Sequence, residues 1–559
     1  MDSIKNKLTK IFKELYPDFP TKSLENFIWE LKDYKDEYES KPKKNESNPE
    51  WYKDAVVYSL YVDLFNNDFS GLIDKLPYLK DLGVNCLWLL PVLESPMRDA
   101  GFDISDYRLI RKNLVGEKGQ KVFYDFLNLA HEKEIKVIFD IAINHTSNQH
   151  YWFKKSALPE KNIYSDYYIW SDNDRGYSKC RLLFKGMCHS NWEKHENGKY
   201  YFHRFFEFQP DLNYRNPNVL FDMCRNFMFW IDKGVDGFRA DAIPYLWKEE
   251  DTDCENLENT HNIVKFFRAV IDFINPSVML LAEACQPPKE VVKYMGDGDE
   301  CHAGYNFPLM PQMFKSIALK SLEPVKNILD LSVTPVIPEN SQWFTFLRCH
   351  DELSLELVYV SEEDRKFIHE TYCHDPKWDF RVGEGISARL SELFKMDPDK
   401  ILAAFNLMLT LPGTPVIYYG DEFAKTNDWA YYNNQIKITG HDDTRNLVRG
   451  KINWDEVLIK IKDENTIEAK VFLNLKEMIS IRKQYKSFSR GRLNFDKFQS
   501  LDIIERVYDE ERIRVLINFS GEEVILEDDD ILSGKILYSY NFSQKEKILK
   551  HFGFIWIFL

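Results

Sequence analysis

Four short apolar runs of the sequence each end in charged residues or histidine, the residue types that carry acid–base and nucleophilic chemistry. In chain order these residues are Asp140, His145, Arg239, Asp241, Glu283, His350 and Asp351. A single acid in such a position could be a helix cap or another structural group. Charge at the ends of four runs is costly to bury unless the groups are paired or used, so together they indicate a catalytic site.

The elements that must position these groups follow a repeated pattern of a short β-rich run and then a helical stretch, starting near Val56. Eight runs are expected to be strands: VVYSLYV, CLWLLPV, KVIFDIAIN, GFRADA, VMLLAEA, HAGYNF, FTFLRCH and TPVIYYGDE. Helical stretches such as GLIDKLPYLKDLG and VFYDFLNLAHEKEI lie between them. The pattern predicts the α/β class and a (β/α)8 TIM barrel, in which the active site lies at the C-terminal ends of the strands.

The remaining segments predict additional domains around this barrel. Residues 1–50 are expected to form an N-terminal helical extension that ends in the polar linker KPKKNESNPE. The barrel is expected to occupy residues 51–145 and 206–487, with an inserted subdomain at 146–205 after its third strand. Short alternating runs in residues 488–559 predict a small C-terminal antiparallel β domain.

Composition excludes several classes of partner. The 559-residue chain carries a formal charge of −16, which argues against a nucleic-acid partner because phosphate binding relies on clustered Lys and Arg. We find no apolar stretch long enough to span a membrane and no apolar core of a signal peptide near the N-terminus. The nine cysteines include no CxxC pair, which favours a cytoplasmic location over a disulfide-bonded one. A homo-oligomer remains compatible with these observations.

Four motifs carry a resemblance to a known family. DIAINH, GFRADA, LLAEA and FLRCHDE are similar, in order and spacing, to the four signature segments of the α-amylase family of glycoside hydrolases. The resemblance extends over roughly residues 51 to 425. It implies that Asp241 is the nucleophile, that Glu283 is the general acid/base, and that Asp351 stabilises the transition state.

The surroundings of the two carboxylates agree with these implied roles. Arg239 lies two residues before Asp241, so in a strand both side chains share one face. Its positive charge is expected to lower the pKa of Asp241 and to hold its carboxylate in place. Glu283 ends a largely apolar run, where a raised pKa is expected. One ionised and one protonated carboxyl group is the pair that a retaining glycosidase needs.

The resemblance also implies which residues bind a sugar. His145 and His350 resemble the family's two histidines that hydrogen-bond to the glucosyl ring, and Arg239 belongs to the same binding set. Asp99 and Arg445 are implied to hold the 4-hydroxyl of a terminal glucose, which would make the site a closed pocket for one glucosyl unit. Phe102 replaces the family's Tyr and can still stack on the sugar ring. The alternative for Arg445 is a surface arginine in a loop of mixed charges.

Within the family, several segments are similar to those of trehalose synthases, which interconvert maltose and trehalose. They are RDAGFDISDYR, WSDNDRGY, QPDLNY and FLRCHDELSLELV. A second long insertion, at about 353–400, could form the lid that an isomerase needs to retain its cleaved glucose. The resemblance predicts a retaining α-glucosyl-transferring isomerase that acts on a small neutral saccharide by double displacement.

Two other functions remain open at this point. The segment HDDTRNLVRG after the eighth strand is more like the corresponding loop of amylosucrases. The alternative is therefore an exo-acting α-glucosidase, a transglucosidase or a sucrose-using glucosyltransferase with the same residues. A non-catalytic carbohydrate-binding protein is a remote alternative, because the three acidic residues implied in catalysis are all present.

The need for a metal is a separate question. Asn144 and Asp211 resemble calcium ligands of the family, so calcium near them is one interpretation. Lys248, however, stands where trehalose synthases carry a Glu ligand, and its ammonium group could replace the charge of the ion. We therefore expect no required metal and no other cofactor.

Overall fold

The computed structural model describes residues 2–41, 48–184, 187–527 and 530–559, and its centre is a closed barrel of eight parallel strands. Each strand corresponds to one of the eight predicted runs, so the predicted (β/α)8 fold is confirmed. The barrel strands are β1 (Val57–Leu60), β2 (Cys86–Leu89), β5 (Lys136–Ala142), β9 (Gly237–Asp241), β10 (Met279–Ala282), β11 (Ala303–Tyr305), β12 (Gln342–Phe346) and β16 (Thr414–Tyr418).

The strands are mostly apolar because helices cover the outside of the barrel while side chains fill its inside. All four residues of β2 are buried, for example. The helix that precedes it, α4 (Phe69–Leu82), begins where the Asp68 side chain accepts a hydrogen bond from the backbone of Gly71. It ends at Gly83, whose φ of 98° is readily accessible only to glycine. These local signals fix the two ends of the helix that precedes β2.

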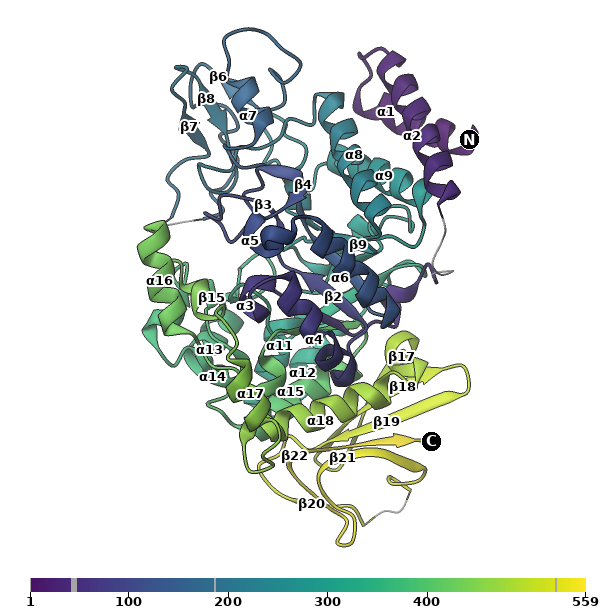
Figure 1. Ribbon diagram of the computed structural model, residues 1–559. Coiled ribbons are helices and arrows are strands. Elements are labelled where there is room, and N and C mark those ends of the chain that lie inside the picture. Colours follow the sequence, from purple (N-terminus) through teal and green to yellow (C-terminus); the bar gives the residue numbers. More distant parts are fainter. Residues whose placement is uncertain (1, 42–47, 185–186, 528–529) are drawn as a thin grey trace.

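Two insertions stand at the end of the barrel where the strands finish. The first follows β5 and contains α7 (Tyr151–Ser156), β6 (Trp170–Ser171), β7 (Trp192–Lys194) and β8 (Tyr200–Phe202), seen at the top left of Figure 1. The second follows β12 and contains β13 (Leu353–Ser354), α13 (Glu362–Tyr372), β14 (Asp379–Phe380) and β15 (Gly385–Ile386). Its three strands form a small antiparallel sheet. We call this second insertion, residues 353–397, the lid segment.

The N-terminal extension consists of α1 (Asp2–Leu15) and α2 (Lys22–Ser40), which lie beside α8 (Pro217–Lys233) and α9 (Glu258–Ile274) (Figure 1). The ring of Phe221 stacks on Phe12, with centroids 6.0 Å apart, and on Phe27, with centroids 4.7 Å apart. Aromatic stacking therefore attaches both helices to the barrel wall. The predicted polar linker falls largely on residues 42–47, which lie outside the described residues.

The C-terminal domain is antiparallel, as predicted. Its strands are β17 (Arg492–Phe498), β18 (Leu501–Tyr508), β19 (Glu511–Ile517), β20 (Val524–Ile525), β21 (Lys535–Ser543) and β22 (Ile548–Phe558). The apolar strand β22 pairs with β19, β20 and β21. Trp556 of β22 donates a hydrogen bond to Asn406 Oδ1 in α15 (Pro398–Thr410), at 2.7 Å, and so joins this sheet to the barrel.

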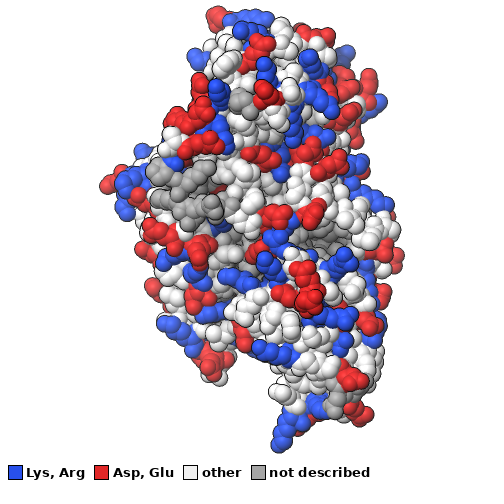
Figure 2. Space-filling view, turned by 90° about the vertical axis from the view of Figure 1, so that its right-hand side faces the viewer, with Lys and Arg blue, Asp and Glu red and all other residues white. Residues whose placement is uncertain are grey.

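Helix hydropathy and the charges on one face of the molecule bear on the partners that the sequence analysis excluded. No helix in the described part of the chain is long and apolar enough to cross a membrane. On the face shown in Figure 2, basic and acidic side chains are intermixed.

The stacking around Phe221 generates a stability prediction. Phe221→Ala removes the buried ring that contacts both Phe12 and Phe27, and is expected to lower the free energy of unfolding by about 3–5 kcal/mol. Urea unfolding followed by circular dichroism measures the change. The control is Trp29→Ala on α2, where the ring is 65% exposed and a change within about 0.5 kcal/mol is expected. Equal effects of the two changes would show that the extension is not held by this contact.

Candidate active site

All nine residues that the sequence predicts for catalysis and sugar binding line one pocket at the C-terminal end of the barrel. They come from β9, from the segments that follow β2, β5, β10, β12 and β16, and from no other part of the chain. The nine are Asp99, Phe102, His145, Arg239, Asp241, Glu283, His350, Asp351 and Arg445. Parallel strands in a barrel end at the same face, which explains how residues so distant in the sequence meet.

Arg239 is the central charge of the pocket. It is 3% exposed, and its Nη1 forms ion pairs with Asp241 Oδ1 and, at 2.8 Å, with Asp140 Oδ1. Its Nη2 lies 3.6 Å from Glu283 Oε1. Trp88 also donates a hydrogen bond to Asp140, at 2.9 Å. One buried guanidinium group therefore contacts three carboxyl groups and offsets part of the cost of burying them.

The ionisation of the nucleophile candidate differs from the sequence-based expectation. Burial raises the pKa of Asp241 to about 6, although Arg239 acts to lower it, and the charges of Asp99 and Asp351 raise it further. Arg239 thus lowers the pKa as expected, but burial outweighs it and the net shift is upward, because the sequence shows the arginine but not the depth of burial. At neutral pH a carboxyl group with this pKa is still mostly ionised.

The environment of Glu283 agrees with an acid/base role. Burial raises its pKa, while Arg239, a backbone N–H and a thiol act in the opposite direction. The backbone N–H of Ala242 donates to Glu283 Oε2 at 2.9 Å, and Cys285 Sγ lies 3.3 Å from Oε1. Ala242 has a φ of 58°, a conformation that costs a non-glycine residue roughly 1–3 kcal/mol. Its strained backbone turns an N–H toward one oxygen of Glu283.

Asp351 is surrounded by hydrogen-bond donors and positive charges. His350 Nε2 lies 3.1 Å from Oδ2, and Arg445 and Arg449 lie 3.2 and 3.3 Å from Oδ1. Burial acts to raise the pKa of Asp351, but His350 and the two guanidinium groups outweigh it and hold this pKa well below the usual range. Asp351 is therefore a permanent negative charge in the pocket.

The two histidines are neutral hydrogen-bonding groups. Burial lowers the pKa of His145 to about 4 and that of His350 to about 3. The ring of His350 beside Asp351 is therefore uncharged at physiological pH. A neutral imidazole can also bind a sugar hydroxyl without adding charge to the site.

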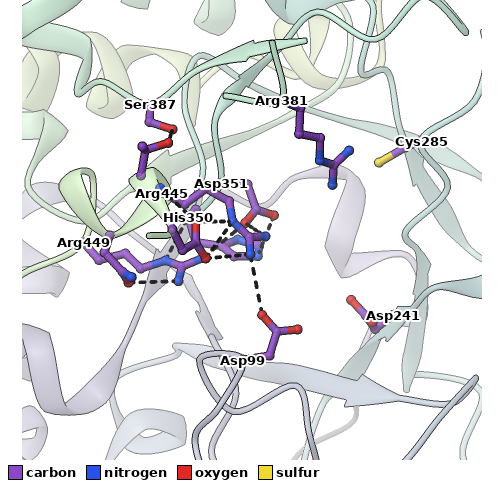
Figure 3. Close-up of polar contacts among 12 residues, drawn as sticks. Asp99, Asp241, Cys285, His350, Asp351, Arg381, Ser387, Arg445 and Arg449 are labelled. Carbon is purple, nitrogen blue, oxygen red and sulfur yellow. Dashed lines mark hydrogen bonds and ion pairs between the residues drawn. The ribbon is translucent and has the colours of Figure 1, made fainter. Parts of the chain in front are cut away.

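Asp99 and Arg445 close one end of the pocket. Arg445 is only 6% exposed, so it is not the surface arginine of the alternative interpretation. Its Nη2 lies 3.7 Å from Asp99 Oδ1, and Asp443 accepts hydrogen bonds from its Nε and Nη2 (Figure 3). Burial raises the pKa of Asp99, against the charge of Arg445. Phe102 stacks on His350 with ring centroids 5.5 Å apart, which places an aromatic face beside this end.

Sequence reasoning missed the other half of the pocket. This half is lined by Cys285, Phe307, Glu352, Glu356 and Arg381. Glu352 and Glu356 follow Asp351 in the segment HDELSLE, and this cluster of acids was a usable signal. The position of Arg381 had no such signal, because it lies in an irregular turn of the lid segment.

The cation position near the first insertion holds a lysine side chain. Lys248 Nζ lies 2.8 Å from Asp211 Oδ2 and donates a hydrogen bond to Asn144 Oδ1 at 2.6 Å. All three side chains are buried. These are the two residues that resemble calcium ligands, so an ammonium group occupies the place between them. Elsewhere in the described chain, no cluster of three or more His, Cys, Asp or Glu side chains is arranged to hold a metal ion.

Comparison with known proteins places this pocket in a family. The family model for the alpha amylase catalytic domain matches residues 30–373. The chain is 43% identical over 389 residues to the trehalose synthase/amylase TreS of Mycobacterium tuberculosis, a match that covers 67% of this chain and 63% of that protein. It is 45% identical to the trehalose synthase of Thermus thermophilus, over 67% of this chain and 39% of that one. The chain thus spans less than two thirds of the length of these relatives.

Other relatives match over nearly the whole chain. Alpha-amylase 3 of Dictyoglomus thermophilum is 30% identical over 527 residues, which cover 90% of this chain and 92% of that protein. Among solved structures, a mutant of the trehalulose synthase MutB has a TM-score of 0.69 at 22% identity, covering 91% of this chain and 99% of that one. This structural likeness supports the fold alone. Together, the family model, the sequence relatives and the four motifs around the pocket show that the chain belongs to the α-amylase family.

Proposed function

We propose that the protein is a retaining α-glucosyl-transferring enzyme that interconverts maltose and trehalose by double displacement. One observation carries the proposal: Asp241 and Glu283 meet in one pocket whose end is closed by Asp99 and Arg445. The similarity to trehalose synthases supports the choice of substrates. We also place the protein in the cytoplasm, since all nine cysteines are free thiols, as is usual in a reducing compartment.

In the first step of the proposed reaction, one carboxylate attacks and another carboxyl group donates a proton. An oxygen of Asp241 bonds to the anomeric carbon of the non-reducing glucosyl unit of maltose, and the bond to the glycosidic oxygen breaks. Glu283 gives its proton to that oxygen, so the second glucose leaves with a free 4-hydroxyl. The fixed negative charge of Asp351 stabilises the positive charge that develops on the sugar ring.

In the second step the retained glucose becomes the acceptor. After it has turned, its anomeric hydroxyl attacks the glucosyl ester and Glu283 takes up the proton. Asp241 leaves as a carboxylate, and the product is trehalose with retained configuration. Water would give two glucose molecules instead, so the yield of isomer depends on how well the pocket excludes it. Ser354, Glu356 and Arg381 of the lid segment line the pocket and reduce its access to water.

A second candidate uses the same residues with a different acceptor or donor. The loop after β16 contributes Asp443 and Arg445, and its segment HDDTRNLVRG is the part that is more like amylosucrases. An exo-acting α-glucosidase or a sucrose-using glucosyltransferase would share the closed glucosyl end of the pocket.

A product analysis separates these functions. The protein is incubated separately with maltose, trehalose and sucrose, in the presence of isotopically labelled glucose, and all products are resolved by chromatography. The proposal predicts formation of trehalose from maltose, the reverse reaction from trehalose, and little label in the disaccharide. Glucose as the sole product would support the glucosidase, and turnover restricted to sucrose would support the sucrose-using enzyme.

Substitution of Asp241 and substitution of Glu283 are expected to affect activity in different ways. Asp241→Asn should abolish turnover of every substrate, since an amide cannot form the glucosyl ester. Glu283→Gln should lower kcat/KM for maltose by about 10²- to 10⁴-fold, yet lower it less than tenfold for α-glucosyl fluoride, whose leaving group needs no proton. Initial rates on both substrates measure this difference. Equal losses on the two substrates would remove Glu283 from the acid/base role.

The pKa of Asp241 generates a prediction for pH dependence. Because the nucleophile must be ionised and its pKa is raised to about 6, kcat/KM should fall as the pH decreases through about 6. The alkaline limb belongs to loss of the proton of Glu283, whose pKa is raised by burial. A profile of kcat/KM from pH 4 to 9 measures both limbs. Full activity maintained down to pH 4.5 would contradict the raised pKa.

The contacts of Lys248 predict independence from metal. Chelator treatment should leave activity and melting temperature unchanged. Lys248→Met should lower the free energy of unfolding by about 3–5 kcal/mol, because it leaves Asp211 as an uncompensated buried charge. The exposed residue Lys154 offers a matched control, since Lys154→Met should change stability by less than about 0.5 kcal/mol.

A second variant tests whether the ammonium group stands in for a cation. Lys248→Glu would place a carboxylate beside Asp211 and Asn144, a set of oxygen ligands suited to calcium. Its melting temperature should rise on addition of calcium, while that of the wild type should not. A calcium-dependent melting temperature in the untreated wild-type protein would overturn this interpretation of Lys248.

A further inference from the structure

The pocket has two halves with different chemistry. The half described above, with Asp99, Phe102, His350 and Arg445, is suited to one glucosyl ring. The other half, as we name it here, is the part of the lining that contains Cys285, Glu352, Glu356 and Arg381, with Cys285 in contact with Glu283. In Figure 3, Arg381 extends into the cavity from the lid segment, on the same side as Cys285 and Asp241 and away from Arg449. The second half therefore has a positively charged group that the glucosyl half does not use.

The backbone that carries Arg381 is strained. Arg381 and Val382 have φ values of 49° and 56°, and Gly383 follows with 85°. Two consecutive left-handed residues other than glycine or asparagine are uncommon, and each costs of order 1–3 kcal/mol. Val382 is 87% exposed, so its own side chain gains nothing from this conformation. The turn instead directs the Arg381 side chain into the pocket.

Side chains of the lid segment hold this turn in place. Arg365 of α13 donates to the carbonyl oxygens of Val382 at 2.8 Å and of Gly383 at 2.9 Å. Asp379 accepts a hydrogen bond from the backbone N–H of Gly383 at 2.7 Å and contacts His369 Nε2 at 2.8 Å. Strain that is fixed by several specific contacts is typical of functional positions.

The guanidinium group of Arg381 is held by two aromatic rings but makes few hydrogen bonds to the protein. It lies over the rings of Phe184 and Phe380, at 4.7 and 4.9 Å from their centroids. Among the described residues, its polar contact is a 3.4 Å hydrogen bond from Nη1 to Glu356 Oε1. Its buried Nε has no hydrogen-bond partner among the described residues. Because Arg381 lines the pocket and makes this one long polar contact, its guanidinium group keeps donors that a ligand could use.

We propose that Arg381 is a specificity-determining residue that binds hydroxyl groups of the departing and returning sugar. The inference rests on the proposed function and goes further by assigning the acceptor half of the pocket. The guanidinium supplies donors in a fixed fork, and Glu352 and Glu356 supply acceptors beside it. Sugar hydroxyls both donate and accept, so a neutral monosaccharide matches this set. The stacked rings of Phe184 and Phe380 limit the movement of the guanidinium and preserve its orientation while the sugar turns.

A simpler role for Arg381 is to balance the charges of Glu352 and Glu356. Burial raises the pKa of both carboxyl groups, and Arg381 opposes this rise. A residue that only balances charge would affect reactions with and without an acceptor sugar alike. A residue that binds the acceptor sugar would affect only those reactions in which this sugar is present.

The test compares a substrate that contains the acceptor sugar with one that lacks it. Arg381→Ala and Arg381→Lys are assayed on α-glucosyl fluoride and on the disaccharide that the wild type turns over. We expect kcat/KM for the fluoride to stay within about threefold, and kcat/KM for the disaccharide to fall roughly ten- to a hundredfold. The share of turnovers that end in free glucose should rise, since a loosely held sugar escapes before it can attack.

Two further variants control for the turn itself. Arg381→Asn places a residue type that tolerates the left-handed region at this position, so it should reproduce the effect of Arg381→Ala with the turn preserved. Val382→Gly relieves strain at the neighbouring exposed position and should leave both rates and the product ratio unchanged. Equal losses on the fluoride and the disaccharide, or an unchanged product ratio, would overturn the assignment of Arg381. Failure of the wild type on the fluoride would overturn the proposed function itself.

Discussion

The buried guanidinium group of Arg239 is the interaction on which the rest of the site depends. Three carboxyl groups lie around it. Burying their negative charges costs free energy, and the positive charge of Arg239 offsets part of this cost. The barrel brings them together through its register, because Asp140 of β5 pairs directly with Arg239 of β9, and Leu281 of β10 pairs with Arg239 on the other side. The register of the closed barrel therefore brings charged residues from separate strands into contact around Arg239. We call Arg239 and its three carboxyl partners one electrostatic unit.

This unit also explains how the two carboxyl groups in the centre can have different roles. Asp241 is held by an ion pair to Arg239, whereas Glu283 is held by a backbone N–H and lies beside a thiol. An ion pair favours the ionised form needed for attack. Glu283 lacks so close an ion pair, and burial raises its pKa, which favours the protonated form needed in an acid. The first insertion and the lid segment then contribute further residues to the wall of the pocket around this pair, among them Phe184, Phe205 and Arg381.

The sequence predicted those features that depend on local pattern. All eight barrel strands were predicted because they are short β-rich runs alternating with helical stretches. The nine predicted site residues, which line one pocket, lie in or next to recognisable motifs. The pKa of Asp241 was not predictable, since burial results from the packing of segments distant in the sequence. Arg381 was missed for a similar reason: its place in the pocket depends on a strained turn held by Arg365, and neither residue belongs to a motif.

The central claim is that Asp241 forms a covalent bond to one glucosyl unit inside this pocket. A 5-fluoro-α-glucosyl fluoride tests it directly. The ring fluorine slows both formation and hydrolysis of the ester, while the good fluoride leaving group speeds formation alone, so the ester accumulates. The protein is treated with this reagent and digested, and its peptides are analysed by mass spectrometry. The account predicts one added fluoroglucosyl group, located on the peptide that contains GFRADA and assigned to Asp241 by fragmentation. Turnover of glucosyl fluoride with no adduct on this peptide, or an adduct on Glu283 instead, would contradict it.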